Sequence, residues 1–326
     1  MTILITGAAG YIGSHTLLAC RDARREVVVL DDLSTGHRSA VPDEVTFKAG
    51  NAGDGALVGE LIRRHGVTAV IHFAGSIVVP DSVSDPLSYY GNNTCVSRTL
   101  IEASLKAGVK HFVFSSTAAV YGNPDQVPIT EDAPTRPISP YGSGKLMTEW
   151  ILRDTAAAHD FSYLALRYFN VAGADPEGRS GQRSERATHL IKVASEVVVG
   201  KREAIEIFGE DYDTPDGTCI RDYIHVSDLA AAHVAGLDYL EADGESQVLN
   251  CGYGRGASVR EVLDSVQRVA GQSITIHSGP RRAGDPMALV ADSTKLRQSL
   301  DWQPSHDDLD GIVGSAVAWE RRLTGA

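Results

Sequence analysis

Tyr141 and Lys145 lie four positions apart at the start of a predicted helix. Ser139 and Pro140 come just before them, and a serine followed by proline is typical of a helix N-terminus. Side chains at this spacing share one helix face, so the phenol and the ammonium point the same way. Tyrosine has a pKa near ~10, and a neighbouring ammonium favours its phenolate. The pair therefore predicts a general base, although exposed helix pairs without any chemistry have the same spacing.

Three glycines, Gly7, Gly10 and Gly13, follow an apolar run at residues 2–6 and lead into a predicted helix. Glycine permits a tight turn and lets the backbone approach a pyrophosphate, while a helix N-terminus supplies free N–H groups and a positive dipole end. The spacing GxxGxxG is one residue longer in its first step than the common GxGxxG. The strand–turn–helix context favours a dinucleotide site over a glycine-rich turn that binds nothing.

Two further side chains stand at predicted strand ends. Asp31 ends the second strand, about twenty residues beyond the glycines, where a carboxylate accepts hydrogen bonds from both ribose hydroxyls and repels a 2′-phosphate. Asp31 therefore favours NAD over NADP, although a lone aspartate there commonly caps a turn. Thr117 follows the strand 111–115, where its hydroxyl could bind a substrate oxygen beside Tyr141. Threonine also ends strands for plain turn reasons.

The elements that must position these residues alternate between short β-branched runs and longer helical patterns, which predicts parallel βαβ units. The runs VVVL and HFVF are nearly all apolar, as expected of strands buried on both faces. Strands are predicted over residues 2–6, 26–30, 45–48, 69–73, 111–115 and 163–168, and helices near 11–22, 57–65, 87–107 and 141–159. We expect an α/β fold with a doubly wound parallel (Rossmann) sheet.

After Asn170 the pattern loosens into residues 171–186, which are rich in Gly, Pro, Arg and Ser and predict a long loop. Helices recur near 187–200, 226–240, 259–270 and 309–322, with short strands between them. We therefore expect an NAD-binding domain over residues 1–172 and a smaller, mixed α/β substrate lobe over 173–326. Part of 223–252 could pack back on the first domain.

Composition limits the function classes. The 326 residues carry a formal net charge of −12, which disfavours a nucleic-acid partner but leaves an anionic small ligand open to a few arginines. No run approaches the ~18 apolar residues of a membrane span, and residues 1–6 lack the basic start of a signal peptide. Cys20, Cys95, Cys219 and Cys251 form no CxxC pair. We expect a cytoplasmic protein with reduced thiols, no structural zinc and no membrane partner.

Taken together, these features resemble the extended short-chain dehydrogenase/reductase family, and within it the nucleotide-sugar epimerases. The resemblance runs through nearly the whole chain: TGAAGYIGSH at 6–15, VIHFAG at 70–75, YYGNN at 89–93, FSSTAAVYG at 114–122, SPYGSGKLMTE at 139–149, LRYFN at 166–170, IFGEDYDTPDGTCIRDYIHVSDLA at 207–230 and PRRAGD at 280–285. The glycine and YxxxK motifs are typical of the superfamily, whereas residues 207–230 are much more specific for nucleotide-sugar epimerases.

The resemblance implies an isomerase that inverts C4 of a UDP-hexose and so interconverts UDP-glucose and UDP-galactose. The phenolate of Tyr141 takes the C4 hydroxyl proton, and hydride passes from C4 to NAD and returns after the 4-keto sugar has turned over. The resemblance also implies a homodimer through the helices near 87–107 and 141–159. It implies no metal ion.

The implied catalytic residues are Tyr141, Lys145 and Thr117. The implied NAD contacts are Gly7, Gly10, Tyr11, Ile12, Gly13, Asp31, Asn51, Ala52, Phe73, Ala74, Gly75, Asn92, Tyr141, Lys145 and Phe169. The implied UDP-sugar contacts are Thr117, Asn170, His189, Leu190, Ile207, Phe208, Arg221, Tyr223, Arg282 and Asp285. Guanidinium groups suit a diphosphate, although Arg221 and Arg282 could instead form surface salt bridges.

Three positions depart from the family pattern. Asn51 replaces an aspartate at the adenine, Ile77 replaces a lysine directed at the cofactor, and His189 replaces an asparagine at the diphosphate. The amide oxygen of Asn51 can still accept a hydrogen bond from the adenine, and His189 can still donate one to the diphosphate. The contact made by the lysine is lost at Ile77.

Several alternatives remain at this point. A nucleotide-sugar dehydratase has an added acid/base pair where this chain has Ala118 and Ala119, and alanines cannot transfer protons. UDP-glucuronate or UDP-N-acetylhexosamine could be the substrate of an epimerase of the same family. A non-catalytic NAD-sensing regulator typically loses the Tyr or the Lys, and both are present. Leu289 either lies beside the hexose C2 substituent, as the resemblance implies, or is ordinary core packing.

Overall fold

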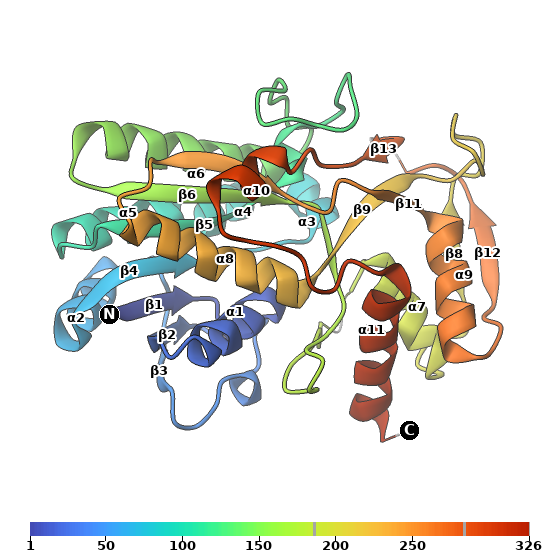
Figure 1. Ribbon diagram of the computed structural model, residues 1–326, viewed down its shortest axis with the longest axis horizontal. Coiled ribbons are helices and arrows are strands. Elements are labelled where there is room, and N and C mark those ends of the chain that lie inside the picture. The colour runs from blue at the N-terminus through green and yellow to red at the C-terminus, as the bar shows by residue number, and fades with distance from the viewer. Residues whose placement is uncertain (185–186, 283–284, 326) are drawn as a thin grey trace.

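The computed structural model describes residues 1–184, 187–282 and 285–325 (Figure 1). The loop predicted over 171–186 and the motif at 280–285 each contain positions outside the described residues, at 185–186 and 283–284.

A parallel sheet of seven strands forms the larger body, in the order β3-β2-β1-β4-β5-β6-β10. Its strands are β1 (Thr2–Thr6), β2 (Glu26–Asp31), β3 (Thr46–Ala49), β4 (Val67–His72), β5 (His111–Thr117), β6 (Ser162–Tyr168) and β10 (Gln247–Cys251). All six strand pairings are parallel. The predicted doubly wound fold is confirmed.

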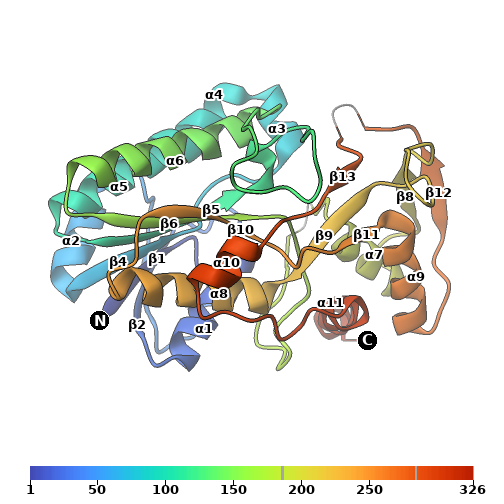
Figure 2. The same cartoon turned by 45° about the horizontal axis from the view of Figure 1, so that its top comes forward.

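Helices cover both faces of this sheet (Figure 2). On one face lie α1 (Tyr11–Asp22) and α8 (Val226–Glu241), and on the other α2 (Gly55–His65), α5 (Val96–Lys106) and α6 (Pro140–Ala158). Successive residues of β1 enter different cores, because side chains alternate along a strand: Ile3 and Ile5 belong to one hydrophobic cluster and Leu4 to the other. Burial on both faces explains the continuous apolar runs of the sequence.

The helix predicted over 87–107 is interrupted. It consists of α4 (Pro86–Tyr89), a π-helical turn (Tyr90–Cys95) and α5. Such turns insert an extra residue into a helix and are frequent at functional sites. A short helix that was not predicted, α3 (Val79–Ser84), precedes α4. Its second residue is a proline, which is common in the first turn of a helix. Short 3₁₀ turns lie at Arg38–Ala40 and Ala118–Val120.

The second body lies beyond the carboxyl ends of the sheet strands, around β9 (Figure 1). It contains β7 (Asn170–Ala172), β8 (Ile205–Phe208), β9 (Ile220–His225), β11 (Gly256–Ser258), β12 (Ile276–Gly279), β13 (Ala288–Leu289), α7 (Leu190–Val198), α9 (Val259–Ala270) and α11 (Leu309–Thr324). The short α10 (Thr294–Ser299) contacts β10. The segment predicted as a loop from residue 171 thus begins inside a strand, and α7 starts three residues later than expected.

Part of residues 223–252, namely α8 and β10, belongs to the larger body. β10 extends the seven-stranded sheet by pairing with β6, and α8 packs along α1. α8 begins at the residue after β9 of the second body. The division of the chain near residue 172 stays a prediction.

Candidate active site

The glycine turn lies where β1 and β4 are neighbours in the sheet and the chain connections diverge to opposite sides. Ligands of open α/β sheets bind at this crossover, beyond the carboxyl ends of the strands. Gly7 has a φ of +75°, and a Cβ there would lie 2.5 Å from the backbone N of Ala74. A Cβ on Gly13 would lie 2.3 Å from the Gly7 carbonyl oxygen. Both positions therefore require glycine.

The amino end of α1 is open to an anion. Gly10 is the N-cap residue and supplies no side-chain hydrogen bond, so the first-turn N–H groups have no side-chain acceptor. Tyr11 and Ile12 begin the helix, and the Tyr11 hydroxyl donates to the carbonyl oxygen of Gly173 at 2.6 Å. The Tyr11 side chain therefore joins α1 to the second body, which leaves only its backbone for a phosphate.

Asp31 is almost fully buried at the end of β2. Its two carboxylate oxygens each accept one backbone N–H at 2.8 Å, from Ala9 and Leu33. Burial raises the pKa of Asp31, and these hydrogen bonds oppose the shift. A carboxylate has about four acceptor sites, so two remain for a ribose diol. Asn51, beside the buried Ala52, donates to Asp32 at 3.3 Å.

The segment after β4 is held by two asparagines of the π-helical turn. The Asn93 amide accepts from the Ser76 N–H at 2.8 Å and donates to the Ser76 carbonyl at 2.9 Å, and the Asn92 amide donates to the Ser76 hydroxyl at 2.9 Å. Phe73 packs against the ring of His233, with 4.8 Å between centroids. Gly75 is thereby fixed next to the glycine turn.

The first turn of α6 packs directly on the chain that leaves β5. The Ser139 hydroxyl caps α6 by accepting the Gly142 N–H at 3.2 Å. A Cβ on Gly142 would lie 2.6 Å from the carbonyl oxygen of Ala119, so glycine permits this close approach. The approach brings the buried Tyr141 next to Thr117, whose hydroxyl favours the phenolate of Tyr141. The role of Thr117 toward a substrate oxygen stays a prediction.

The pKa of Tyr141 shifts in the direction opposite to the one expected. Burial raises it to about 12, and the hydrogen bond with Thr117 only partly opposes this. Lys145 is also buried, and burial lowers its pKa to about 8. Its Nζ donates to the Ser115 carbonyl oxygen at 2.7 Å rather than to Tyr141. The protein alone therefore keeps Tyr141 protonated, and a further positive charge is needed to favour the phenolate.

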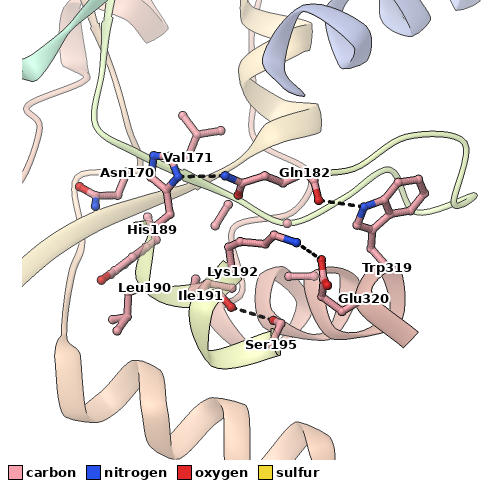
Figure 3. Close-up of a pocket in the computed structure, with 14 residues that line it drawn as sticks. Asn170, Val171, Gln182, His189, Leu190, Ile191, Lys192, Ser195, Trp319 and Glu320 are labelled. Carbon is pink, nitrogen blue, oxygen red and sulfur yellow. Dashed lines mark hydrogen bonds and ion pairs between the residues drawn. The ribbon is translucent and has the colours of Figure 1, made fainter. Parts of the chain in front are cut away.

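Part of the predicted substrate set lines one cavity of the second body (Figure 3). Asn170 on β7 is paired with Tyr223 on β9, and His189 and Leu190 lie at the start of α7. These four predicted residues share the cavity with residues that were not predicted, namely Gln182, Lys192, Ser195, Trp319 and Glu320.

The remaining predicted substrate residues lie along β9 and beside it. Arg221 is two positions before Tyr223, so both side chains leave the same face of the strand. Arg221 is buried and forms an ion pair with Asp285, another predicted contact. The Arg282 guanidinium lies 3.8 Å from the centroid of the Phe208 ring, next to the buried Ile207. Arg221 thus pairs from a buried position, and Arg282 has no ion pair with the residues that the structure describes.

Phe169 lies in a small hydrophobic cluster between the two bodies. The cluster also contains Ala118, Val120, Tyr121, Ile129, Leu146 and Ala291, and Leu289 packs against it. Leu289 thus packs against the cluster that contains Phe169, the residue predicted beside the nicotinamide.

Residues 3–252 match the NAD dependent epimerase/dehydratase family. The chain belongs to this family.

Known proteins are similar to this chain over almost its whole length. A UDP-glucose 4-epimerase from Azospirillum brasilense is 58% identical over 321 residues, which are 98% of this chain and 92% of the relative. The structure of the UDP-glucose 4-epimerase from Brucella ovis in complex with NAD has a TM-score of 0.94 and 43% identity, with 97% of both chains covered. The UDP-Glc/GlcNAc 4-epimerase from Campylobacter jejuni has a TM-score of 0.87 and 48% identity, with 98% of this chain and 99% of that chain covered.

The residues at the crossover of this family member fit a dinucleotide. The glycines leave no room for side chains where a pyrophosphate approaches, the α1 N-terminus lacks a cap, and Asp31 keeps free acceptor sites. The prediction of NAD as the cofactor is confirmed by membership of the family. Among the residues described, no group of three or more His, Cys, Asp or Glu side chains could hold a metal ion, and no helix is long and apolar enough to cross a membrane.

Sequence reasoning missed Gln182 and Asn93 in this epimerase/dehydratase chain. Gln182 lies in a segment without periodicity, where no pattern indicates which side chains turn inward. Asn93 is next to the predicted Asn92, and only the π-helical turn reveals that both side chains reach Ser76. The individual contacts assigned to NAD and to the UDP-sugar stay predictions.

Proposed function

We propose that this protein is an NAD-dependent epimerase that inverts C4 of a UDP-hexose and interconverts UDP-glucose and UDP-galactose. The observation that carries this proposal is the contact between the buried Tyr141, at the start of α6, and the buried Thr117, at the end of β5. The full-length similarity to UDP-glucose 4-epimerases supports the reaction type.

In the proposed mechanism, Tyr141 removes the proton of the C4 hydroxyl, and Thr117 holds the same hydroxyl oxygen by a hydrogen bond. NAD supplies the hydride acceptor and donor at C4 when bound. The ammonium of Lys145, on the same helix face, would lower the raised pKa of Tyr141 toward the working range. On the way back, protonated Tyr141 returns its proton to the C4 oxygen after the 4-keto sugar has exposed its other face.

The second body would hold the UDP half while the sugar turns. Arg221 and Arg282 supply guanidinium groups suited to a diphosphate, and Asn170 and His189 supply neutral donors. Asp285 keeps Arg221 in place by their ion pair and accepts from the uridine ribose. Inversion requires that UDP stays bound while the hexose can rotate, because the same base must reach both faces of C4.

The dehydratase alternative lacks its acid/base pair. Ala118 and Ala119 follow Thr117 directly, and both belong to the 3₁₀ turn at Ala118–Val120. Methyl groups cannot transfer the protons that loss of water across C5–C6 needs. A non-catalytic regulator is disfavoured because Tyr141, Lys145 and Thr117 are all retained and buried together.

Purified protein is expected to contain NAD, since the cofactor is regenerated within each turnover and never needs to leave. Denaturing the protein and separating the released nucleotides by chromatography tests this.

Asp31→Ala should weaken NAD binding by about 10- to 150-fold, because a hydrogen bond to a charged group contributes ~1.5–3 kcal/mol. Asp43→Ala, at an exposed position of the same domain, is the control. Recovery of NADP, or unchanged affinity in Asp31→Ala, would contradict the assignment.

Leu289→Tyr is expected to narrow the range of UDP-sugars that the enzyme accepts as substrates. Wild type should act mainly on UDP-glucose and UDP-galactose, with weak turnover of UDP-N-acetylglucosamine, because leucine is shorter than tyrosine but larger than serine or cysteine. A pocket discriminates by ~1–3 kcal/mol per methylene-sized change, or about 10- to 200-fold in kcat/KM. Met287→Tyr, on the same segment but exposed, is the control. If the ratio of kcat/KM values for the two kinds of sugar is unchanged in Leu289→Tyr, Leu289 is ordinary packing.

We further propose a cytoplasmic homodimer. Exposed apolar side chains gather on neighbouring helices of one face: Val83 on α3 is 62% exposed, Leu87 on α4 82% and Trp150 on α6 46%. Such a patch favours a protein interface. Sedimentation should give twice the chain mass, and Leu87→Asp with Trp150→Asp should give the single-chain mass. A monomeric wild type would remove the proposal.

A further inference from the structure

Gln182 and His189 are joined by a hydrogen bond in the cavity of the second body (Figure 3). The amide nitrogen of Gln182 lies 2.9 Å from Nδ1 of the His189 imidazole. An amide nitrogen can only donate, so Nδ1 must accept with its lone pair. A neutral imidazole carries one proton, and here that proton must be on Nε2.

The tautomer matters because the surrounding protein keeps His189 neutral. Burial among protein atoms lowers the pKa of His189, yet the side chain stays exposed to the cleft. No other hydrogen bond reaches the ring from the residues that the structure describes. A neutral imidazole attracts an anionic oxygen only through its N–H, and it repels that oxygen through its lone pair.

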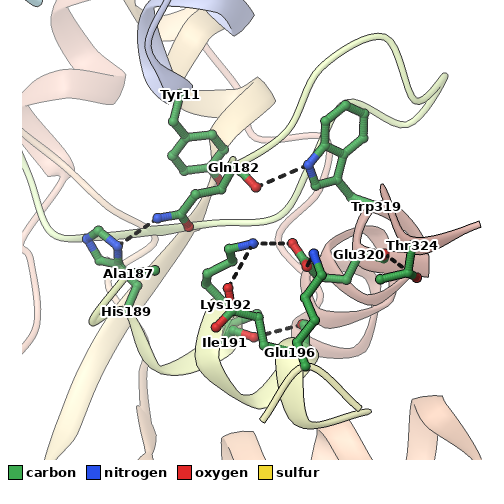
Figure 4. A network of polar contacts seen from close by, with 12 residues as sticks. Tyr11, Gln182, Ala187, His189, Ile191, Lys192, Glu196, Trp319, Glu320 and Thr324 are labelled. Carbon is green, nitrogen blue, oxygen red and sulfur yellow. Dashed lines mark hydrogen bonds and ion pairs between the residues drawn. The ribbon is translucent and has the colours of Figure 1, made fainter. Parts of the chain in front are cut away.

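The cation of the same cavity is already neutralised. Lys192 forms ion pairs with Glu196, at 3.2 Å, and with Glu320 (Figure 4). Glu320 also pairs with Lys201 at 2.9 Å. The cavity therefore offers an anion neutral donors rather than the charge of Lys192.

The position of Gln182 is fixed by its backbone. Its carbonyl oxygen accepts from the indole N–H of Trp319 at 3.1 Å. A Cβ on the preceding Gly181 would lie 2.5 Å from the Trp319 ring, so the chain lies flat against the indole. Gly181 is also bridged to Ala174. Gln182 is 6% exposed and so presents its amide from a rigid support.

We propose that Gln182 is a positioning residue that holds His189 as its Nε2–H tautomer, oriented to donate to the diphosphate of the substrate. This proposal rests on the proposed function, because it takes the anion to be the diphosphate of a nucleotide sugar. Gln182 itself touches no reacting atom. It fixes the direction of the proton on a side chain that would.

The tautomer can be read without any substrate. In holoenzyme carrying ¹⁵N-labelled histidine, with His189→Asn used to assign the signals, Nδ1 of His189 should give the unprotonated type of nitrogen signal and Nε2 the protonated type. In Gln182→Glu the carboxylate can only accept, so Nδ1 should become protonated. A protonated Nδ1 in the wild type would overturn the proposal, whatever the enzyme's substrate.

A double-mutant cycle tests the consequence for binding. Gln182→Met, which keeps the volume but cannot donate, should raise KM for UDP-galactose, and the Kd of UDP, by about 2- to 10-fold, as expected for loss of one neutral hydrogen bond. The kcat should stay within about twofold, because the diphosphate is held equally in ground and transition states.

The same change in a His189→Asn background should have no further effect, since an asparagine amide can donate without a partner. An equal effect in both backgrounds would show that Gln182 only supports the loop, and would overturn the proposal. If the wild type binds UDP but does not epimerise UDP-galactose, the proposed function fails, while the UDP cycle and the nitrogen signals still decide the role of Gln182.

Discussion

Tyr141→Phe is expected to lower kcat by about 10²- to 10⁴-fold while the protein keeps its fold and its NAD. The phenylalanine ring fills the same buried space between α6 and the chain after β5, and only the hydroxyl that exchanges the proton is removed. The lost hydrogen bond with Thr117 is worth ~0.5–1.5 kcal/mol of stability, so the melting temperature should fall by only a few degrees. The measurement is turnover of UDP-galactose together with a thermal unfolding curve.

Tyr163→Phe, on β6 within a hydrophobic cluster, is the matched control and should leave kcat near wild type. If Tyr141→Phe keeps more than about a third of the wild-type kcat, far above the range for a lost general base, Tyr141 is not that base.

Lys145→Met should have the second-largest effect, seen most clearly in the pH profile. Burial raises the pKa of Tyr141. An ammonium on the same helix face favours the phenolate, so we expect its removal to raise this pKa further. The rise of activity with pH should therefore move to higher pH. In the wild type, activity should fall above about pH 8, because Lys145 becomes neutral there. This decline should be absent from Lys145→Met.

Methionine is close to lysine in length and has no charge to bury, so the variant should fold. Lys106→Met, an exposed change at the end of α5, serves as the control. A pH profile that coincides with that of the wild type would show that Lys145 does not influence the base.

The elements with signals at both ends could be predicted closely. The helix predicted near 259–270 coincides with α9, whose ends carry local signals: Ser258 and Glu261 form a capping box, and Gly271 ends the helix in the left-handed conformation. α1 likewise begins after Gly10. The course of 87–107 could not be predicted, since one continuous amphipathic pattern does not reveal where a π-helical turn inserts a residue.

The candidate site divides in the same way. Tyr141, Lys145 and the glycines follow from fixed spacings, which carry geometry within a single element. The pKa directions did not follow, because they depend on burial from several elements, and burial dominates both Tyr141 and Lys145. Contacts between Gln182 and His189 depend on a loop whose path is set by Trp319, far away in the sequence.

Incubation of the purified protein with UDP-galactose, with no NAD added and with the products resolved by chromatography, tests the central claim most directly. The account predicts conversion to UDP-glucose, and the same final mixture when the reaction starts from UDP-glucose. Failure of NAD-containing, folded protein to interconvert the two sugars would contradict it, as would a product that has lost water.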